Sequence, residues 1–306
     1  MTQDTLSTHD AAADPRNDRI LIHVDGQLLP RAQAVVSVYD SGFLLGDGIW
    51  EGLRLYNGNI PFLDDHLDRL YEAATYLRMD IGKTRQDLVQ AIRDTLDAND
   101  MTHDVHIRLM VTRGRKSKPF QHPHLSIHGA TIVIIAEHSR PDTALIQRGI
   151  RLHTVPHHRG LPLTQDPKLN SHSKLNCIIA LNHALDAGAD EALMLDPHGF
   201  VNTTNACNVF IVRRGEVWTS TGDYCMNGIT RGKVIELCQA DGIPIHQRNF
   251  SLVEAYGADE AFLTGTFGAQ TPVVQIDGRQ IGAGAAGPVF HRIRELYADL
   301  IASGAA

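Results

Sequence analysis

Short apolar runs alternate with amphipathic stretches along this chain, and most end at glycine, asparagine or aspartate. The run 20–24 precedes Asp25-Gly26, a pair typical of a two-residue hairpin turn. Apolar residues at helical spacing, often with acidic residues in the first turn, predict helices elsewhere. The other expected strands are 34–38, 50–56, 105–112, 130–136, 150–155, 191–195, 209–213 and 217–220. One expected helix begins at residue 64, and the others cover 85–99, 175–187 and 231–240.

Helices and short strands alternate irregularly, with several hairpins. That order favours an α+β fold over a doubly wound parallel sheet. The polar stretch 138–148 contains Pro141 and predicts a linker between a small N-terminal domain, residues 19–137, and a larger C-terminal domain, residues 149–306. Residues 1–18 are polar and acidic, without a hydrophobic signal core, and we interpret them as a mobile tail.

Composition narrows the class of protein. The 306 residues are 43% hydrophobic, enough for the cores of two domains. The net charge of −7 argues against a nucleic-acid surface, and no apolar run approaches the length of a membrane span. The four cysteines lack metal-binding spacing, which predicts reduced, buried thiols and no metal site. Together these features predict a cytoplasmic protein without nucleic-acid or membrane partners.

Two glycine-containing segments suit an oxyanion. Gly228-Ile229-Thr230 opens a predicted helix, whose N-terminus offers unpaired N–H donors and the positive end of a dipole. The segment 264–266 reads Thr-Gly-Thr and adds hydroxyl groups beside a close backbone approach. Neither segment is a Walker loop or a dinucleotide fingerprint, so a nucleotide is not the expected ligand. Taken alone, either one is also typical of an ordinary capped helix or turn.

Several ordered segments together resemble the fold-type IV pyridoxal phosphate (PLP) enzymes. That family includes branched-chain aminotransferases, D-amino acid aminotransferases and aminodeoxychorismate lyase. The resemblance runs from about residue 20 to residue 289, nearly the whole chain. The matching segments are DSGFLLGDGIWE at 40–51, HLDRL at 66–70, GADEA at 188–192, NVF at 208–210, GITR at 228–231, GT at 265–266 and TPV at 271–273.

The resemblance implies a small N-terminal α/β domain and a larger C-terminal domain with a barrel-like sheet. It also implies PLP as cofactor, a homodimer with active sites near the interface, and small amino acids and 2-oxo acids as substrates. By position, Arg69 would bind the cofactor phosphate together with Gly228, Ile229, Thr230 and Thr266. An arginine fork plus helix N–H groups makes a strong clamp for a dianion. A solvated helix face is the alternative for Arg69.

The family needs a lysine that forms a Schiff base with PLP. A gap-free count back from Gly188 reaches Asn170 with D-aminotransferase spacing and Leu169 with branched-chain spacing. A short insertion after Lys168 restores the match, so Lys168 is the expected catalytic residue. Lys174, in the first turn of the next predicted helix, is the alternative. A third reading leaves neither lysine catalytic.

The family also places a glutamate beside the pyridine nitrogen of PLP, where it keeps the ring a good electron sink. Counting back from Asn208 puts Thr203 at that position, and a hydroxyl cannot supply the negative charge. This departure raises lyase chemistry as an alternative to transamination. In the other reading, Thr203 or Asn205 bonds the ring through water and transamination survives, more slowly.

The expected substrate residues are drawn from both subgroups of the family, so the chirality of the substrate stays open. Arg108 sits where branched-chain enzymes carry an arginine, and Lys118 where D-aminotransferases carry one. A solvated basic loop is the alternative for the run that contains Arg113, Arg115, Lys116 and Lys118. Plain core is the alternative for Phe43 and Trp50. The remaining candidates are Phe43, Trp50, Phe267 and Gly268.

The leading hypothesis is therefore a PLP-dependent aminotransferase. A PLP-dependent lyase and a non-catalytic PLP-binding relative are the alternatives.

Overall fold

The computed structural model describes residues 7–9 and 11–304, which divide into two compact units. The smaller unit comprises residues 12–140 and 169–174. The larger unit comprises residues 141–168 and 175–304 together with the described residues before 12. The segment between 168 and 175 therefore leaves the larger unit, packs with the smaller one and returns.

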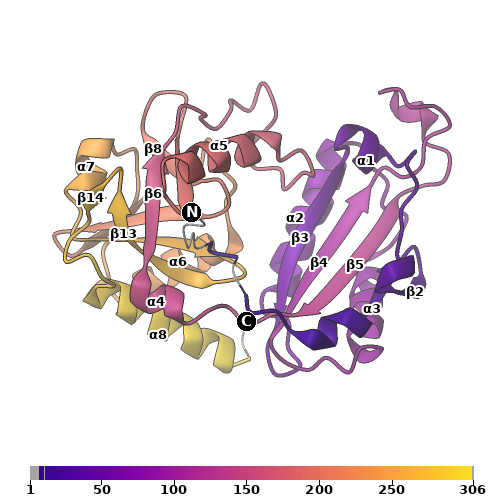
Figure 1. Ribbon diagram of the computed structural model, residues 1–306, viewed down its shortest axis with the longest axis horizontal. Helices are drawn as coiled ribbons and strands as arrows, with labels where there is room; N and C mark the ends of the chain where they lie inside the picture. The colour runs from indigo at the N-terminus through magenta and orange to yellow at the C-terminus, as the bar shows by residue number, and fades with distance from the viewer. Residues whose placement is uncertain (1–6, 10, 305–306) are drawn as a thin grey trace. The chain divides into compact units, whose positions relative to one another are not determined.

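The smaller unit is built on an antiparallel sheet in the order β2-β1-β5-β4-β3 (Figure 1). The hairpin expected at Asp25-Gly26 is confirmed, because Val24 pairs with Gln27 and both turn residues have positive φ, 48° and 88°. The strands are β1 (Leu21–Val24), β2 (Gln27–Pro30), β3 (Gly48–Leu55), β4 (Val105–Thr112) and β5 (Thr131–His138).

One face of this sheet packs against helices α2 (Leu63–Tyr76) and α3 (Arg85–Asp97), as Figure 1 shows. Along β4 and β5 the side chains alternate between buried and half-buried, which is the period of a sheet with one covered face. The half-buried side chains of β4, among them Arg108, therefore lie on the face away from the helices. The remaining short helices are η1 (Pro15–Arg19), η2 (Arg31–Gln33), α1 (Ser41–Leu45) and η3 (Pro123–Leu125).

The strand expected at 34–38 is wrong. These residues form no strand and lie between η2 and α1, where the side chains of Val35 and Val38 are 72% and 66% exposed. Three valines in five residues satisfy the composition of a strand, but a strand also needs a partner, and none pairs with this segment among the described residues.

The larger unit contains a second sheet in the order β11-β10-β9-β12-β13-β6-β7-β8. Strand β8 also pairs with β9, through Thr203 and Asn208, so β9, β12, β13, β6, β7 and β8 form a closed ring. This ring is the barrel-like sheet expected for fold type IV. The strands are β6 (Ile150–Thr154), β7 (Glu191–Leu195), β8 (Val201–Thr204), β9 (Asn208–Arg213), β10 (Glu216–Thr219), β11 (Ile245–Gln247), β12 (Glu260–Gly265), β13 (Ala269–Ile276) and β14 (Arg279–Gln280).

Helices α6 (Ile229–Ala240) and α8 (Pro288–Ala302) pack on each other and on β12. Phe262 of β12 stacks on Phe210 of β9 with 5.0 Å between ring centroids and fills the space beneath both helices. The other helices of this unit are α4 (Ala144–Arg148), which lies inside the expected linker 138–148, α5 (Leu175–Asp186) and α7 (Leu252–Tyr256). No helix in residues 7–9 and 11–304 is both long and apolar enough to cross a membrane.

Candidate functional site

The N-terminus of α6 is built as an anion site. Its N-cap is Gly228, and no side chain caps the helix. The first-turn residue Thr230 is 3% exposed. A Cβ atom on Gly228 would collide with the side-chain oxygen of Asn208, so only glycine permits this close approach. The helix therefore presents backbone N–H groups and one hydroxyl residue where a phosphate can be bound.

Asn208 brings the candidates of the larger unit together. On β9 it pairs with Thr203 of β8 on one side and with Thr264 of β12 on the other. Its side-chain amide donates to the carbonyl of Met226 at 2.9 Å, which fixes the loop that leads to Gly228. From the sequence, Asn208 served only as the reference position from which Thr203 was located. The signal for its role was its place in the matched NVF segment.

The turn between β12 and β13 is flanked by buried polar atoms without partners. Thr264 pairs with Gln270 across the hairpin, and the residues between them form the turn. The hydroxyl of Thr264 and both amide atoms of Gln270 are buried and unpaired among the described residues. Buried polar groups are normally hydrogen-bonded, so these atoms indicate a place where a polar ligand would be held. The expected phosphate residue Thr266 and the expected substrate residues Phe267 and Gly268 make up this turn.

Thr203 does not act as a free hydroxyl. Its Oγ1 donates to the carbonyl oxygen of Cys207 at 2.7 Å and closes the turn between β8 and β9. Asn205, in the same turn, accepts from the N–H of Ala192 at 2.8 Å. Thr203 and Asn205, the two residues expected beside the pyridine ring, thus form hydrogen bonds with backbone groups, and neither provides a carboxylate.

In the smaller unit, Arg69 forms a two-pronged ion pair. Its Nε and Nη2 atoms donate to the two carboxylate oxygens of Glu51 at 2.8 and 2.6 Å. His66 adds a hydrogen bond of 2.7 Å to the same carboxylate. Glu51 and His66 are almost fully buried, whereas the side chain of Arg69 remains 15% exposed. The carboxylate therefore orients the guanidinium, and Arg69 is more constrained than a solvated helix arginine.

Burial and charge oppose each other in this cluster. Burial alone would raise the pKa of Glu51, but the hydrogen bonds from Arg69 and His66 outweigh it and hold that pKa below its usual range. Burial lowers the pKa of His66 in spite of the neighbouring carboxylate. The cluster is therefore an ionised Glu51 held by Arg69 and a neutral His66.

A second group of candidates surrounds the indole of Trp50 on β3. The guanidinium carbon of Arg108 lies 3.8 Å from the centroid of the indole, and Nζ of Lys174 lies 5.7 Å from it. Arg108 has no acidic partner among the described residues, and burial lowers its pKa. Trp50 and Arg108 lie on the sheet face opposite the helices, whereas Glu51 points toward Arg69 on α2. This arrangement leaves a cationic, partly aromatic surface suited to an anion.

The two candidate lysines fall in different units. Lys168 belongs to the larger unit and is exposed, and its backbone N–H donates to Asp166 at 2.9 Å. Lys174 belongs to the smaller unit and is half-buried. Between them, Asn170 is 4% exposed and hydrogen-bonded to the backbone of Trp50, while its Oδ1 is buried and unpaired. An isolated bridge between Ser171 and Ile49 ties this segment to β3, and Lys174 follows it beside Trp50.

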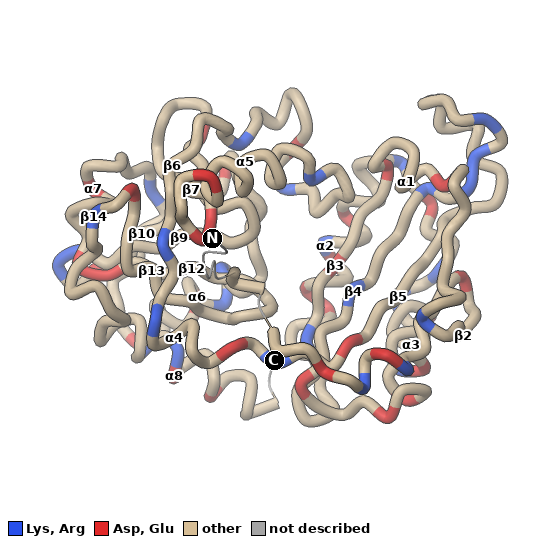
Figure 2. The backbone as a smooth tube through the Cα atoms, viewed as in Figure 1, with Lys and Arg blue, Asp and Glu red and all other residues tan. Residues whose placement is uncertain are grey.

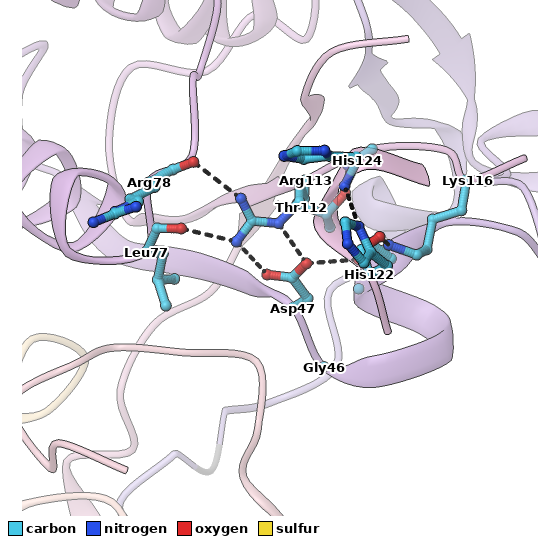
Figure 3. Close-up of polar contacts among 12 residues, drawn as sticks. Gly46, Asp47, Leu77, Arg78, Thr112, Arg113, Lys116, His122 and His124 are labelled. Atoms are coloured by element: carbon cyan, nitrogen blue, oxygen red, sulfur yellow. Dashed lines mark hydrogen bonds and ion pairs between the residues drawn. The ribbon is translucent and has the colours of Figure 1, made fainter. Parts of the chain in front are cut away.

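The basic loop between β4 and β5, marked by several blue segments in Figure 2, is only partly solvated. Lys118 is exposed, as is Phe43 on α1. Lys116 is 2% exposed and donates to the carbonyl of His122 at 3.1 Å. Arg113 donates to both carboxylate oxygens of Asp47, at 2.7 and 3.0 Å, as Figure 3 shows. The reading of this whole run as a solvated basic segment is therefore wrong for Arg113 and Lys116.

The residues of the larger unit fit a phosphate-bearing cofactor. An uncapped helix N-terminus, a glycine that a Cβ would obstruct and unpaired buried polar atoms near the β12–β13 turn all favour one. The chain also offers two lysine amines, on either side of Asn170. In the described part of the chain, no group of three or more His, Cys, Asp or Glu side chains is placed to hold a metal ion.

Comparison with known proteins gives a consistent result. The model of the family "Amino-transferase class IV" matches residues 48–276. The branched-chain-amino-acid aminotransferase-like protein 2 of Arabidopsis thaliana is 41% identical over 286 residues, 94% of this chain and 51% of the relative. The chain thus spans about half the length of that relative. The branched-chain-amino-acid aminotransferase of Pseudomonas aeruginosa is 34% identical over 291 residues, 92% of each chain.

A solved structure extends this likeness to the fold. The branched-chain amino acid aminotransferase of T.th., complexed with N-(5'-phosphopyridoxyl)-L-glutamate, superposes with a TM-score of 0.85 at 31% sequence identity. The likeness covers 94% of this chain and 95% of that chain.

Proposed function

This chain belongs to the class IV aminotransferases, the fold-type IV enzymes that use pyridoxal 5'-phosphate, and we propose on that premise that it moves an amino group between an amino acid and a 2-oxo acid. The observation that carries the proposal is the uncapped N-terminus of α6, with Gly228 against Asn208. A phosphorylated cofactor is the ligand that this terminus suits best.

The proposed machinery consists of the residues that the family resemblance singles out. The proposed phosphate site uses the backbone N–H groups and hydroxyls of Gly228, Ile229, Thr230 and Thr266. Arg69, which Glu51 orients, adds a positive charge. When bound, PLP supplies the carbonyl that receives the amino group and a conjugated ring that accepts electrons. Phe267, Gly268 and the Trp50–Arg108 surface bind the substrate and its carboxylate. Phe43 and Lys118 complete the proposed substrate site.

The proposed catalytic amine is that of Lys168, with Lys174 as the alternative. Its role is to bind the cofactor covalently in the resting enzyme and to move a proton at the substrate Cα. The exposure of Lys168 leaves its amine accessible, whereas Lys174 is held beside Trp50 and Arg108. The two assignments predict a label on different residues, so they are directly separable.

The test is an absorbance spectrum of the PLP-loaded protein, followed by borohydride reduction and peptide mapping. A band near ~410–430 nm that an amino donor shifts to ~330 nm is the signature of the first half of a transamination. Mass spectrometry of the reduced protein then locates the modified lysine. A spectrum of free PLP, unchanged by a panel of L- and D-amino acids, would exclude the proposed reaction.

A lyase is the second candidate, and the hydrogen bond that commits Thr203 to Cys207 favours it. Without a carboxylate at the ring nitrogen, electrons are withdrawn less strongly into the ring. Pyruvate and ammonia released without a 2-oxo acid acceptor would support the lyase. Transfer that depends strictly on an acceptor would exclude it.

We also propose a homodimer in the cytoplasm. The smaller unit exposes several large apolar side chains, which an interface would cover: Val35, Val36, Val38, Phe43, Phe120 and Ile127. The four cysteines are buried and unpaired, which suits a reducing compartment. Light scattering of the purified protein tests the dimer, and a mass of a single 33.6 kDa chain would exclude it.

A further inference from the structure

The described residues 7–9, which we call the N-terminal strap, dock on the larger unit. Thr8 is 3% exposed, and its backbone N–H and hydroxyl both donate to Oε1 of Glu191, at 3.1 and 2.7 Å. The sequence predicts a mobile tail here. Mobility itself stays a prediction, but Thr8 makes contacts that a solvated tail lacks.

Glu191 explains why the strap docks. It lies on β7 and is 1% exposed. Among the described residues, both hydrogen bonds to its carboxylate come from Thr8, and its Oε2 is buried without a partner. A buried carboxylate that loses its donors is costly. Docking of the strap is therefore coupled to the stability of β7.

The strap also covers the turn between β12 and β13. The ring of His9 stacks on that of Phe267, with 6.0 Å between centroids and 13° between planes. The carbonyl oxygen of Thr8 lies 3.4 Å from the place that a Cβ on Gly268 would take. Beneath the strap, the Sγ atom of Cys207 lies 3.5 Å from the hydroxyl of Thr8. The strap thus spans from the turn to the strands behind it.

We propose that Thr8 and His9 are positioning residues that hold the turn 266–268 in its ligand-binding shape. The proposal rests on the proposed function, in which this turn binds the cofactor phosphate and the substrate. Gly265 and Gly268 give this part of the backbone more conformational freedom than other residues would. The neighbouring Ala269 has a φ of 55°, a left-handed conformation that the surrounding contacts must maintain. Anchoring Phe267 from outside restricts the turn, so loss of the strap weakens binding more than it slows chemistry.

The test compares Thr8→Val with Thr8→Ser. Valine keeps the shape but removes the hydroxyl, whereas serine retains it. We expect Thr8→Val to raise the dissociation constant of PLP and the KM for the amino donor about three- to tenfold, with kcat within about twofold. We expect Thr8→Ser to behave as the unaltered chain. PLP titration by absorbance, steady-state kinetics and thermal unfolding give the readouts.

Thr95→Val is the matched control. Thr95 is fully buried in the smaller unit, and its hydroxyl donates to the carbonyl of Ala91 at 2.7 Å. Its loss should lower the melting temperature without changing PLP affinity or KM. If Thr8→Val likewise lowers only the melting temperature, the strap is merely structural and the proposal is overturned. An equal loss with Thr8→Ser would also overturn it.

The thiol of Cys207 provides a readout that needs no turnover. Burial and the nearby Glu191 raise its pKa to about 12, and the strap covers it. We expect Thr8→Val to accelerate alkylation of Cys207 by iodoacetamide, measured by peptide mapping, and bound PLP to slow it again. If the unaltered protein binds PLP but transaminates no donor, the proposed function fails. The difference in PLP affinity between the valine and serine variants still decides the strap.

Discussion

The two units prepare their candidate residues for anions in different ways. In the larger unit the site is mostly backbone: the N-terminus of α6 and the turn between β12 and β13, held in register by Asn208. In the smaller unit the candidates are charged side chains oriented by other side chains, as Glu51 orients Arg69. A backbone site tolerates loss of single side chains, whereas a charge cluster depends on each member. The predictions below test that difference.

The largest effect is expected from the catalytic amine. Replacement of Lys168 by Ala should lower kcat by about 10²–10⁴-fold or more, because it removes the proton carrier. Lys174→Ala, in the other unit, should affect KM more than kcat. Borohydride trapping on the two variants checks the result, since the label must vanish only with the true site. Full activity of Lys168→Ala would transfer the role to Lys174.

Breaking the charge cluster of the smaller unit should be costly. Glu51→Gln leaves Arg69 without its anionic partner and His66 without its acceptor, and loss of one member of a buried ion pair costs about 3–5 kcal/mol. Urea unfolding measures this change. Asp68→Asn is the control, because its partner Arg85 is exposed and the pair contributes little. Equal stability of Glu51→Gln and the unaltered chain would contradict the role of the cluster.

Acid should destabilise the same cluster. The pKa values of His66 and Glu51 are both lowered in the folded state, so the unfolded chain binds more protons. The stability supplied by His66 is present above its ordinary value of 6.5 and falls away below it. That supplied by Glu51 is lost further down, below 4.5. The urea concentration at the unfolding midpoint should therefore fall steadily as the pH is lowered from about 7 to about 4. The same fall should be smaller in the His66→Gln variant.

Substitutions of the buried Lys116 test whether the stem or the charge of a side chain stabilises the smaller unit. Lys116 is 2% exposed, and its ammonium donates to one carbonyl group. Lys116→Met keeps most of the stem and should stay within about 1 kcal/mol of the unaltered chain, whereas Lys116→Ala should cost about 2–4 kcal/mol through the cavity it leaves. Thermal unfolding compares them. Equal losses would show that the charge, not the stem, holds the loop.

The smallest effect is expected in the backbone site. Thr230→Ala removes one hydroxyl but leaves the helix N–H groups, so affinity for PLP should fall only about three- to tenfold. Gly228→Ala moves the backbone away from Asn208 and should cost more. If Thr230→Ala abolished binding, the contrast between the two units would be false.

Local sequence signals identified most of the fold. The strand 105–112 and the hairpin at Asp25-Gly26 follow from alternation and turn chemistry, and both are confirmed. The strand expected at 34–38 is wrong because a valine-rich composition cannot supply a pairing partner. Strand β8, at Val201–Thr204, was not expected, because three of its four residues are polar. They become buried only when the ring of strands closes.

The site was less accessible to sequence reasoning. Gly228 and Thr230 could be identified because a helix N-terminus is a local feature. The fork between Arg69 and Glu51 joins residues 18 apart, and the contact between Thr8 and Glu191 joins residues 183 apart. No local pattern encodes such pairs. The assignments of Lys168, Lys174 and the substrate residues remain predictions.

The strap also sets an order of events during synthesis on the ribosome. Thr8 is synthesised before the carboxylate and the turn that receive it, which lie at 191 and 266–268. At about 5–20 residues per second, the strap waits for tens of seconds while the smaller unit is translated and can fold. Because the larger unit takes in chain from both before and after the smaller unit, its contacts with the strap form only after the smaller unit has been translated.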